Sequence, residues 1–217
     1  MKRDPFGAAG AGLPERLAHQ LAFCLELDRA KAVERHNTLA DGSRREGDAE
    51  HMWHVAVMAA VLAEHADEPV DAARVVLMLL LHDVVEIDAG DTLLYDEAGR
   101  AAAAAREAAG AARIFGLLPG DQGASLRRLW EEFEAGETAD ARFARAIDRL
   151  APMLLNAAAG GSVWRAHGVT AAQVAGNEAR VAAASGALAA VARAVVDAAV
   201  ADGALPPGQG RREKFSK

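Results

Sequence analysis

The stretch MLLLHDVVEIDAGD at residues 78–91 constrains the fold more than any other part of the chain. Its apolar half belongs in a protein core, yet it ends in His82, Asp83 and Glu86, and Asp91 follows in a glycine-opened turn. Ionisable side chains at the end of a core helix must find partners, bind a metal ion or lose their charge. Metal binding explains the whole group, although a capped helix end with solvated acids remains an alternative for His82 and Asp83 taken alone.

Helical spacing brings these side chains together. Glu86 follows His82 by four residues and Asp83 by three, so it can lie near both on one side of a helix. An imidazole nitrogen and a carboxylate oxygen make a mixed site for a borderline or harder divalent ion. A nearby carboxylate outside the coordination sphere could then transfer protons.

The composition favours an all-α fold. Ala dominates the 217 residues, and with Leu, Arg and Glu it is typical of close-packed helices. Tyr, Ile and Thr, which are common in sheets, are few. We expect a single domain over residues 13–205, with disordered tails at 1–12 and 206–217.

Charge and targeting features exclude several classes of function. The net charge of −7 gives no general attraction for nucleic acid. The N-terminus lacks the apolar run of a signal peptide, and the apolar runs are too short or too interrupted to span a membrane. The single cysteine, Cys24, rules out an internal disulfide, and in the run LAFCLEL it is expected in the core. These features predict a soluble, cytoplasmic protein.

Apolar periodicity predicts the order of the helices. Leu13, Leu17, Leu21 and Leu25 recur at the spacing of a buried stripe in a helix that continues to about residue 35. The polar stretch HNTLADGSRREGDAE and the segment 157–168 are expected as loops. Further helices are expected from residue 49, from 71 to 82, from 98 to 115, from 126 to 135, from 138 through 154 and from 170 to 201, the last with a weak point at Ser185-Gly186.

Two ionisable residues lie on the apolar faces of these helices. His51 falls on one face with Val55, and Asp148 lies between Ile147 and Leu150. Taken alone, His51 fits a hydrogen-bonded core histidine, and Asp148 fits a boundary salt bridge.

The ordered set AEH at 49–51, HD at 82–83, E at 86, GD at 90–91 and ID at 147–148 resembles the HD-domain metal-dependent phosphohydrolases. The branch that it resembles contains the bacterial 5'-deoxynucleotidases and their eukaryotic HD-domain relatives. The resemblance extends over about residues 35–148. It implies an HD-domain helical bundle with a metal-binding core at about 35–155, flanking N- and C-terminal helices, and a homodimer.

The resemblance also implies the site residues. The metal ligands would be His51, His82, Asp83 and Asp148, holding one divalent ion that could be manganese, cobalt, magnesium, iron or zinc. The extra histidine signature of two-metal relatives is absent, which favours one ion. Glu86 and Asp91 would be the catalytic carboxylates, and Arg35 would bind the phosphate. Arg44 and Glu46 match the family's R-x-E element, and Arg44 is a second candidate for the phosphate. A solvated loop arginine is the alternative for Arg35 and for Arg44.

Two further residues are candidates for substrate binding. Trp164 and His167 come soon after Asp148 and would line a base pocket, with core packing as the alternative for Trp164. His36 and Met52 depart from the residues expected beside Arg35 and His51, so the sugar and base preference stays open.

The predicted function is metal-dependent hydrolysis of (deoxy)nucleoside 5'-monophosphates to nucleoside and phosphate. The ion would acidify water and neutralise phosphate charge, as phosphomonoester hydrolysis requires. The alternatives are hydrolysis of another phosphate substrate (a phosphodiester, a pyrophosphate or a non-nucleotide phosphate) and a non-catalytic module that binds metal or nucleotide.

Overall fold

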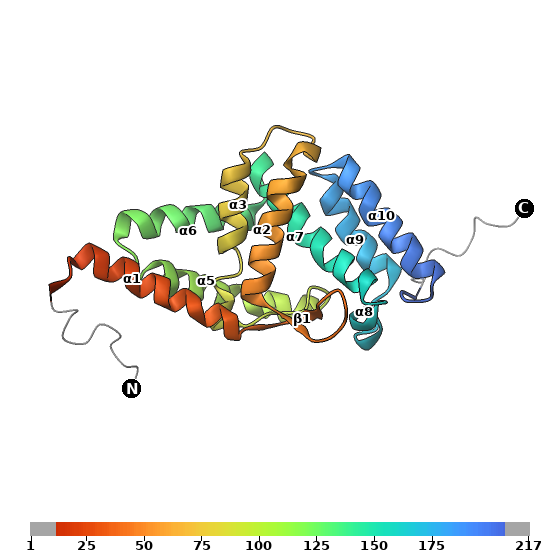
Figure 1. The fold of residues 1–217 in the computed structure, drawn as a ribbon, viewed down its shortest axis with the longest axis horizontal. Coiled ribbons are helices and arrows are strands. Elements are labelled where there is room, and N and C mark those ends of the chain that lie inside the picture. Colours follow the sequence, from red (N-terminus) through yellow and green to blue (C-terminus); the bar gives the residue numbers. More distant parts are fainter. Residues whose placement is uncertain (1–11, 207–217) are drawn as a thin grey trace, which may run out of the picture.

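The structure, a computed structural model, describes residues 12–206, and the described chain is mostly helical (Figure 1). The tails predicted at 1–12 and 206–217 therefore lie almost entirely outside the described residues. The elements in chain order are α1 (Glu15–Leu27), the 3-10 helix η2 (Asp28–Ala32), β1 (Glu34–Thr38), β2 (Arg45–Gly47), α2 (Asp48–Leu62), the 3-10 helix η3 (Ala63–His65), α3 (Ala72–Leu81), α4 (Glu86–Ala89), α5 (Glu97–Phe115), α6 (Gly120–Ala135), α7 (Ala139–Ala158), α8 (Ser162–Ala166), α9 (Ala171–Ala182) and α10 (Gly186–Ala201).

The middle of the molecule is built from α2, α3 and α7, which pack against one another. In Figure 1, α1, α5 and α6 extend to one side of this group, and α9 and α10 lie on the other. The all-α prediction with flanking helices is therefore confirmed. The core includes the fully buried side chains of Val55, Met78, Leu79 and Ile147, which come from all three central helices.

The apolar helix α3 begins and ends as its sequence predicts. The Asp71 carboxylate caps it by accepting hydrogen bonds from the backbone N–H groups of Ala73 and Arg74. The helix ends at Leu81, and a tight turn carries His82 and Asp83 before α4 begins at Glu86. Gly90, with a φ of 73°, ends α4 in a conformation that favours glycine. The ionisable groups thus stand at the break between two helices.

Helix α7 also follows its prediction. Thr138 caps it by accepting a hydrogen bond from the backbone N–H of Ala141. Its inward face buries Phe143, Ile147 and Leu150 to within 1% of full burial, and Asp148 is buried beside them. An acid on so apolar a face needs a partner in the protein interior.

The polar stretch predicted as a loop contains β2 and most of β1, two short antiparallel strands, and β1 begins at Glu34 within the segment predicted to be helical. Glu34 pairs with Gly47 and Thr38 with Arg45, with an irregular register between them. Alternation along β1 buries Arg35 between the more exposed Glu34 and His36. The prediction was wrong because tertiary contacts of these polar side chains, and not their strand propensity, hold the hairpin in place.

The predictions for the first helix were partly wrong. Leu17 and Leu25 are 40% and 48% exposed, and Cys24 is exposed, so neither the leucine stripe nor the cysteine lies in the core. Helix α1 contacts α5 along a neighbouring face, where the Phe23 ring stacks on Phe115 with centroids 6.4 Å apart. Leucine spacing gave the helix but could not say which side of it would be covered.

The C-terminal third mostly matches expectation. Thr170 and Gln173 form a capping box at the start of α9, where a helix was expected to begin, and the chain breaks before α10 at the expected weak point, Ser185. The segment 157–168 is not all loop, because it contains the short helix α8. Among residues 12–206, no helix combines the length and the apolarity needed to cross a membrane.

Candidate metal centre

Two histidines and two aspartates converge from three separate segments. His51 lies on α2, His82 and Asp83 follow α3, and Asp148 lies on α7. His51 Nε2 is 3.1 Å from Asp148 Oδ1 and 3.8 Å from Asp83 Oδ2. His82 Nε2 is 3.0 Å from Asp83 Oδ2 and 3.4 Å from Asp148 Oδ1. The Nε2 atom of each histidine therefore lies within 3.8 Å of an oxygen of both aspartates.

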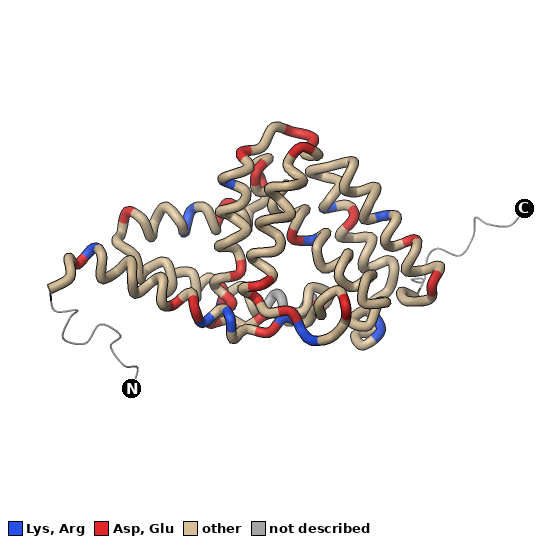
Figure 2. Tube along the Cα trace, viewed as in Figure 1, with Lys and Arg blue, Asp and Glu red and all other residues tan. Residues whose placement is uncertain are grey.

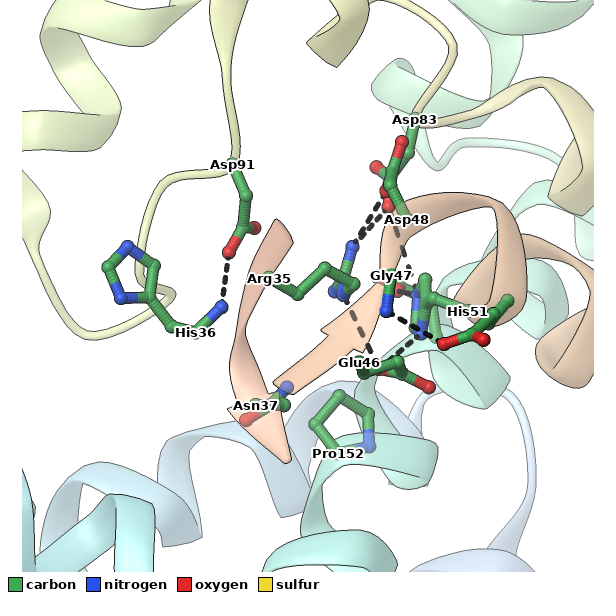
Figure 3. Close-up of polar contacts among 12 residues, drawn as sticks. Arg35, His36, Asn37, Glu46, Gly47, Asp48, His51, Asp83, Asp91 and Pro152 are labelled. Carbon is green, nitrogen blue, oxygen red and sulfur yellow. Dashed lines mark hydrogen bonds and ion pairs between the residues drawn. The ribbon is translucent and has the colours of Figure 1, made fainter. Parts of the chain in front are cut away.

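An oxygen atom lies near the Nδ1 atom of each imidazole, on the side away from the aspartates. His82 Nδ1 lies 2.9 Å from the carbonyl oxygen of Leu79, which makes it the donor and turns Nε2 towards the acids. His51 Nδ1 is 3.5 Å from Glu46 Oε2 (Figure 3). A carbonyl or carboxylate behind a histidine is the usual arrangement that fixes the tautomer of a metal ligand.

The charges of the cluster are strongly coupled. Burial alone would lower the pKa of His82, but the charge of Asp83 and the contact with Asp148 raise this pKa well above its ordinary value. Burial alone would raise the pKa of Asp148, but the neighbouring Arg149 and the two histidines hold it well below its usual range. The cluster without a metal ion therefore favours ionised carboxylates and a protonated His82, which means that the site attracts positive charge.

The donor set fits a divalent ion. His82 Nε2 is buried, and no hydrogen-bond partner of normal geometry is found for it among the described residues. His51, His82 and Asp83 each offer a ligand atom, and these atoms lie within 4.8 Å of one another. Two imidazoles and two carboxylates suit manganese, cobalt, iron or zinc, with magnesium as a harder alternative.

Arg35 is buried beside this centre and surrounded by acids. Its Nη1 is 2.6 Å from Asp83 Oδ2 and 3.3 Å from Asp48 Oδ1, and its Nε is 3.5 Å from Glu46 Oε2. Figure 3 shows the guanidinium between Asp48 and Asp83 on one side and Glu46 on the other. Figure 2 shows acidic residues gathered in this part of the molecule, where the strands and the start of α2 meet.

Asp48 is a site residue that the sequence did not reveal. It is fully buried, and its ligand oxygen lies within 4.8 Å of those of Asp83 and Glu86. Burial and the charge of Asp83 raise the pKa of Asp48 to about 8. Its position three residues before His51, one helical turn away, was the available signal, but an acid at a helix start is ordinarily a capping residue.

The two predicted catalytic carboxylates face the same cavity. Its volume is about 240 Å³, and Arg35, His82, Asp83, Glu86, Asp91 and Asp148 all line it. Burial, with the charges of Asp83 and Asp48, raises the pKa of Glu86 well above its usual value. Asp91 Oδ2 accepts a hydrogen bond of 2.7 Å from the backbone N–H of His36, which ties the turn after Gly90 to β1. The two predicted catalytic carboxylates and three of the four predicted metal ligands thus line one cavity.

The predicted substrate-binding residues are divided by the fold. Arg35 lines the cavity, but Arg44 is exposed and pairs with Glu50 through two hydrogen bonds of 2.8 and 2.7 Å. His167 contacts His36 edge to face, with ring centroids 5.6 Å apart, at a second hollow that Asp91 also lines. Trp164 is fully buried and lines neither the cavity nor the second hollow. This position fits the alternative that Trp164 packs in the core.

Comparisons with known proteins agree with this geometry. Residues 27–189 match the family model described as an HD domain. The curated 5'-deoxynucleotidase HDDC2 of Homo sapiens is 34% identical over 106 residues, which cover 49% of this chain and 50% of that protein. The Bos taurus counterpart is 35% identical over 104 residues, which cover 48% of this chain and 49% of that protein. The chain thus spans about half the length of the curated relatives it matches.

A solved structure is similar over a greater length. It is the crystal structure of a predicted metal-dependent phosphohydrolase from Magnetospirillum magnetotacticum, with 53% sequence identity and a TM-score of 0.85. The match covers 89% of this chain and 100% of that one.

Proposed function

The chain belongs to the HD-domain family, and from this premise we propose that it is a metal-dependent phosphohydrolase acting on (deoxy)nucleoside 5'-monophosphates. The observation that carries the proposal is the clustering of His51, His82, Asp83 and Asp148. The last three of these line a cavity together with Glu86 and Arg35. The names of the curated relatives, 5'-deoxynucleotidase HDDC2, support a nucleotide as the substrate.

The two histidines and two aspartates would hold one divalent ion. When bound, the ion supplies a Lewis acid that withdraws charge from phosphate oxygen and lowers the pKa of water. The imidazole Nε2 atoms and the carboxylate oxygens are the ligand atoms, and Leu79 O and Glu46 keep the rings turned towards them.

Arg35 would hold a phosphate oxygen of the substrate. Its guanidinium always carries a positive charge and offers paired donors. Asp48, Asp83 and Glu46 surround it and fix its position before any substrate arrives. A guanidinium that is already ordered loses little entropy when it binds an anion.

Glu86 and Asp91 would move the protons. A carboxylate with a raised pKa is a stronger base once ionised, so Glu86 is suited to take a proton from the attacking water. Asp91 would donate to, or position water at, the leaving 5'-oxygen. The two roles are separable by variants.

Phosphate release from a panel of deoxy- and ribonucleoside 5'-monophosphates tests the function. The protein is stripped with a chelator and resupplied with manganese, cobalt or magnesium. We expect metal-dependent release that falls by at least about 100-fold in Glu86→Gln, the order expected for loss of a general base. Arg127→Ala is the matched surface control and should keep its activity within about twofold, because exposed ion pairs such as Arg127–Glu131 contribute little.

The outcome also separates the alternatives. Metal binding without release from any monophosphate would contradict the proposal and favour another phosphate substrate or a binding module. If the protein leaves the monophosphates intact but hydrolyses an added phosphodiester or pyrophosphate, the substrate class changes and the metal site keeps its role.

We propose further that the protein forms a homodimer. Exposed Trp53, Val57 and Val61 recur every four residues on α2, and Leu77 and Leu80 are exposed on the adjacent α3. Such apolar side chains on neighbouring helices make this side of α2 and α3 the candidate dimer surface. Light scattering on wild type and Val57→Asp tests this, with a monomeric mass expected only for the variant.

A cytoplasmic location stays a prediction from the sequence.

A further inference from the structure

One end of the cavity contains a buried amide with an unused acceptor. Asn156 lies on α7, is only 3% exposed and lines the cavity. Its Nδ2 donates to the side-chain oxygen of Asn37 at 3.0 Å and to the backbone oxygen of Pro152 at 2.9 Å. The Pro152 carbonyl can only accept, so the amide orientation follows, and Nδ2 has no proton left for another partner.

The other half of this amide is unsatisfied. Asn156 Oδ1 is buried, and no donor within the described residues reaches it. A buried acceptor without a donor costs about 1–3 kcal/mol. Two hydrogen bonds fix the Asn156 amide through Nδ2, while Oδ1 has no donor among the described residues. Oδ1 is therefore available to accept a hydrogen bond from a ligand.

A second unused group lies on the same helix face. Arg149, Pro152 and Asn156 follow one another at intervals of three and four residues, so they share one side of α7, and all three line the cavity. Arg149 Nε is buried without a hydrogen-bond partner, although Nη1 lies 3.6 Å from Asp148 Oδ2. Its unused N–H complements the unused acceptor of Asn156.

The order along α7 gives the two groups different distances from the metal ligands. Asp148 is a predicted metal ligand, and Arg149 is next to it. Asn156 is about 12 Å from Asp148 along the helix axis, at a rise of about 1.5 Å per residue. A phosphate held near Asp148 and Arg35 would therefore extend its organic part along Arg149 towards Asn156. In Figure 3, Asn37 and Pro152, the two partners of Asn156, lie side by side and apart from Asp83.

We infer that the side of the cavity along α7, from Arg149 to Asn156, is a recognition subsite for the leaving group. Arg149 Nε donates to an oxygen or nitrogen of the nucleoside near the phosphate, and Asn156 Oδ1 accepts a hydrogen bond from an N–H or O–H further along it. The inference rests on the proposed function, since it assigns the organic half of the same substrate. The amides of Asn37 and Asn156 carry no charge, and the charge of Arg149 faces Asp148, so the far end suits a neutral base edge or sugar hydroxyl.

The test compares substrates that lack one donor at a time. The parent is the 5'-monophosphate that wild type hydrolyses best, and its analogues lack the base N–H donors, the 3'-hydroxyl or, for a ribonucleotide, the 2'-hydroxyl. Wild type should lose about tenfold or more in kcat/KM for one of these analogues, because the unpaired Asn156 acceptor then stays buried. The analogue that is affected identifies the base or the sugar as the source of the donor.

Asn156→Ala should remove this discrimination, so that the variant hydrolyses parent and analogue within about twofold of each other. Phenyl phosphate, which has no donor on its leaving group, serves as the control substrate and should be hydrolysed equally by both proteins. Because discrimination is a ratio within one protein, partial loss of folded variant does not affect it.

Three results would overturn the inference. Wild type could treat all analogues alike, Asn156→Ala could keep the full discrimination, or the variant could lose phenyl phosphate and nucleotide hydrolysis equally. Failure of the proposed function looks different, since metal-loaded wild type would then release no phosphate from any 5'-monophosphate, and the inference would fall with it.

Discussion

Buried charge dominates the site at the scale of single residues. Glu46, Asp48 and Asp148 are nearly inaccessible to solvent, and Asp83 lies among them. Arg35 contacts three of these four carboxylates. Since an unpaired buried charge costs several kcal/mol, Arg35 and a bound cation each offset part of the same negative charge. Substrate binding and stability of the site are therefore linked through one guanidinium.

Glu46 connects the metal ligand His51 to Arg35, and its removal should weaken metal binding. Glu46→Gln takes away the charge 3.5 Å from His51 Nδ1, which lowers the basicity of the ring. We expect the affinity for manganese to fall by about 10-fold or more, the usual effect of losing a carboxylate behind a metal-bound histidine. Titration calorimetry on chelator-stripped protein measures this.

Glu50→Gln is the matched control for that variant. Glu50 belongs to the same helix start, but it is exposed and pairs with Arg44 and the Gly47 N–H. Its affinity for manganese should equal that of wild type within about twofold. Equal losses in the two variants would show that Glu46 has no special role.

At the scale of elements, the site depends on where helices end and how closely they approach. The turn between α3 and α4 carries Asp83, and α5 packs directly on α4. A side chain at Gly110 on α5 would place its Cβ 2.9 Å from the carbonyl oxygen of Val85, closer than such contacts allow. Gly110 therefore sets the distance between α5 and the segment that holds the ligands.

Gly110→Ala should push this turn out of place. We expect a loss of about 1–3 kcal/mol in the free energy of unfolding, as for other overpacked sites. Activity should fall by about tenfold or more, because small displacements of reacting groups are costly. Urea denaturation and phosphate release measure the two effects.

Gly176→Ala provides the opposite case within another helix. Nothing lies within 4 Å of a Cβ at Gly176, which is exposed on α9. Alanine should therefore raise the free energy of unfolding by about 0.5–1 kcal/mol and leave activity unchanged. A destabilised Gly176→Ala together with a neutral Gly110→Ala would contradict this account of the packing.

At the scale of the whole molecule, the candidate metal centre lies where three segments that are distant in sequence meet. Its predicted ligands come from α2, from the end of α3 and from α7. An ion that binds only the folded state stabilises it by RT ln(1 + [L]/Kd). Metal binding should therefore act as a cross-link in the middle of the fold.

The stabilisation by metal should increase with pH. Despite burial, contacts with Asp148, Glu46 and Asp83 raise the pKa of His51 and of His82 above the ordinary histidine value. A raised pKa stabilises the metal-free fold below about pH 6.5, and this contribution is lost as the pH rises through the folded pKa. Metal binding needs neutral imidazoles, so it strengthens over the same range.

Thermal unfolding with manganese and with a chelator checks this prediction. The difference in Tm between the two samples should be larger at about pH 8.5 than at about pH 6. A difference that shrinks towards high pH would contradict the protonation of the free histidines.

The chemistry of the candidate site and most of the helices could be read from the amino-acid sequence alone. Asp71 and Thr138 cap helices in the structure as their sequence positions indicated, and His51, His82, Asp83 and Asp148 meet as the ordered motif implied. A helix cap depends on residues within one turn of each other, so it can be predicted from the local sequence. The ligand order was readable because the resemblance supplied contacts that spacing alone could not.

Only the tertiary structure decided what lies around those ligands. Asn156 meets Asn37 across 119 residues of sequence, Arg35 meets Asp83 across 48, and Cys24 is left exposed by the side on which α1 packs. Periodicity within a segment predicts a face, but the neighbour that covers the face comes from elsewhere in the chain. Burial, and with it the raised pKa of Glu86 and the unsatisfied oxygen of Asn156, exists only once those distant segments have packed together.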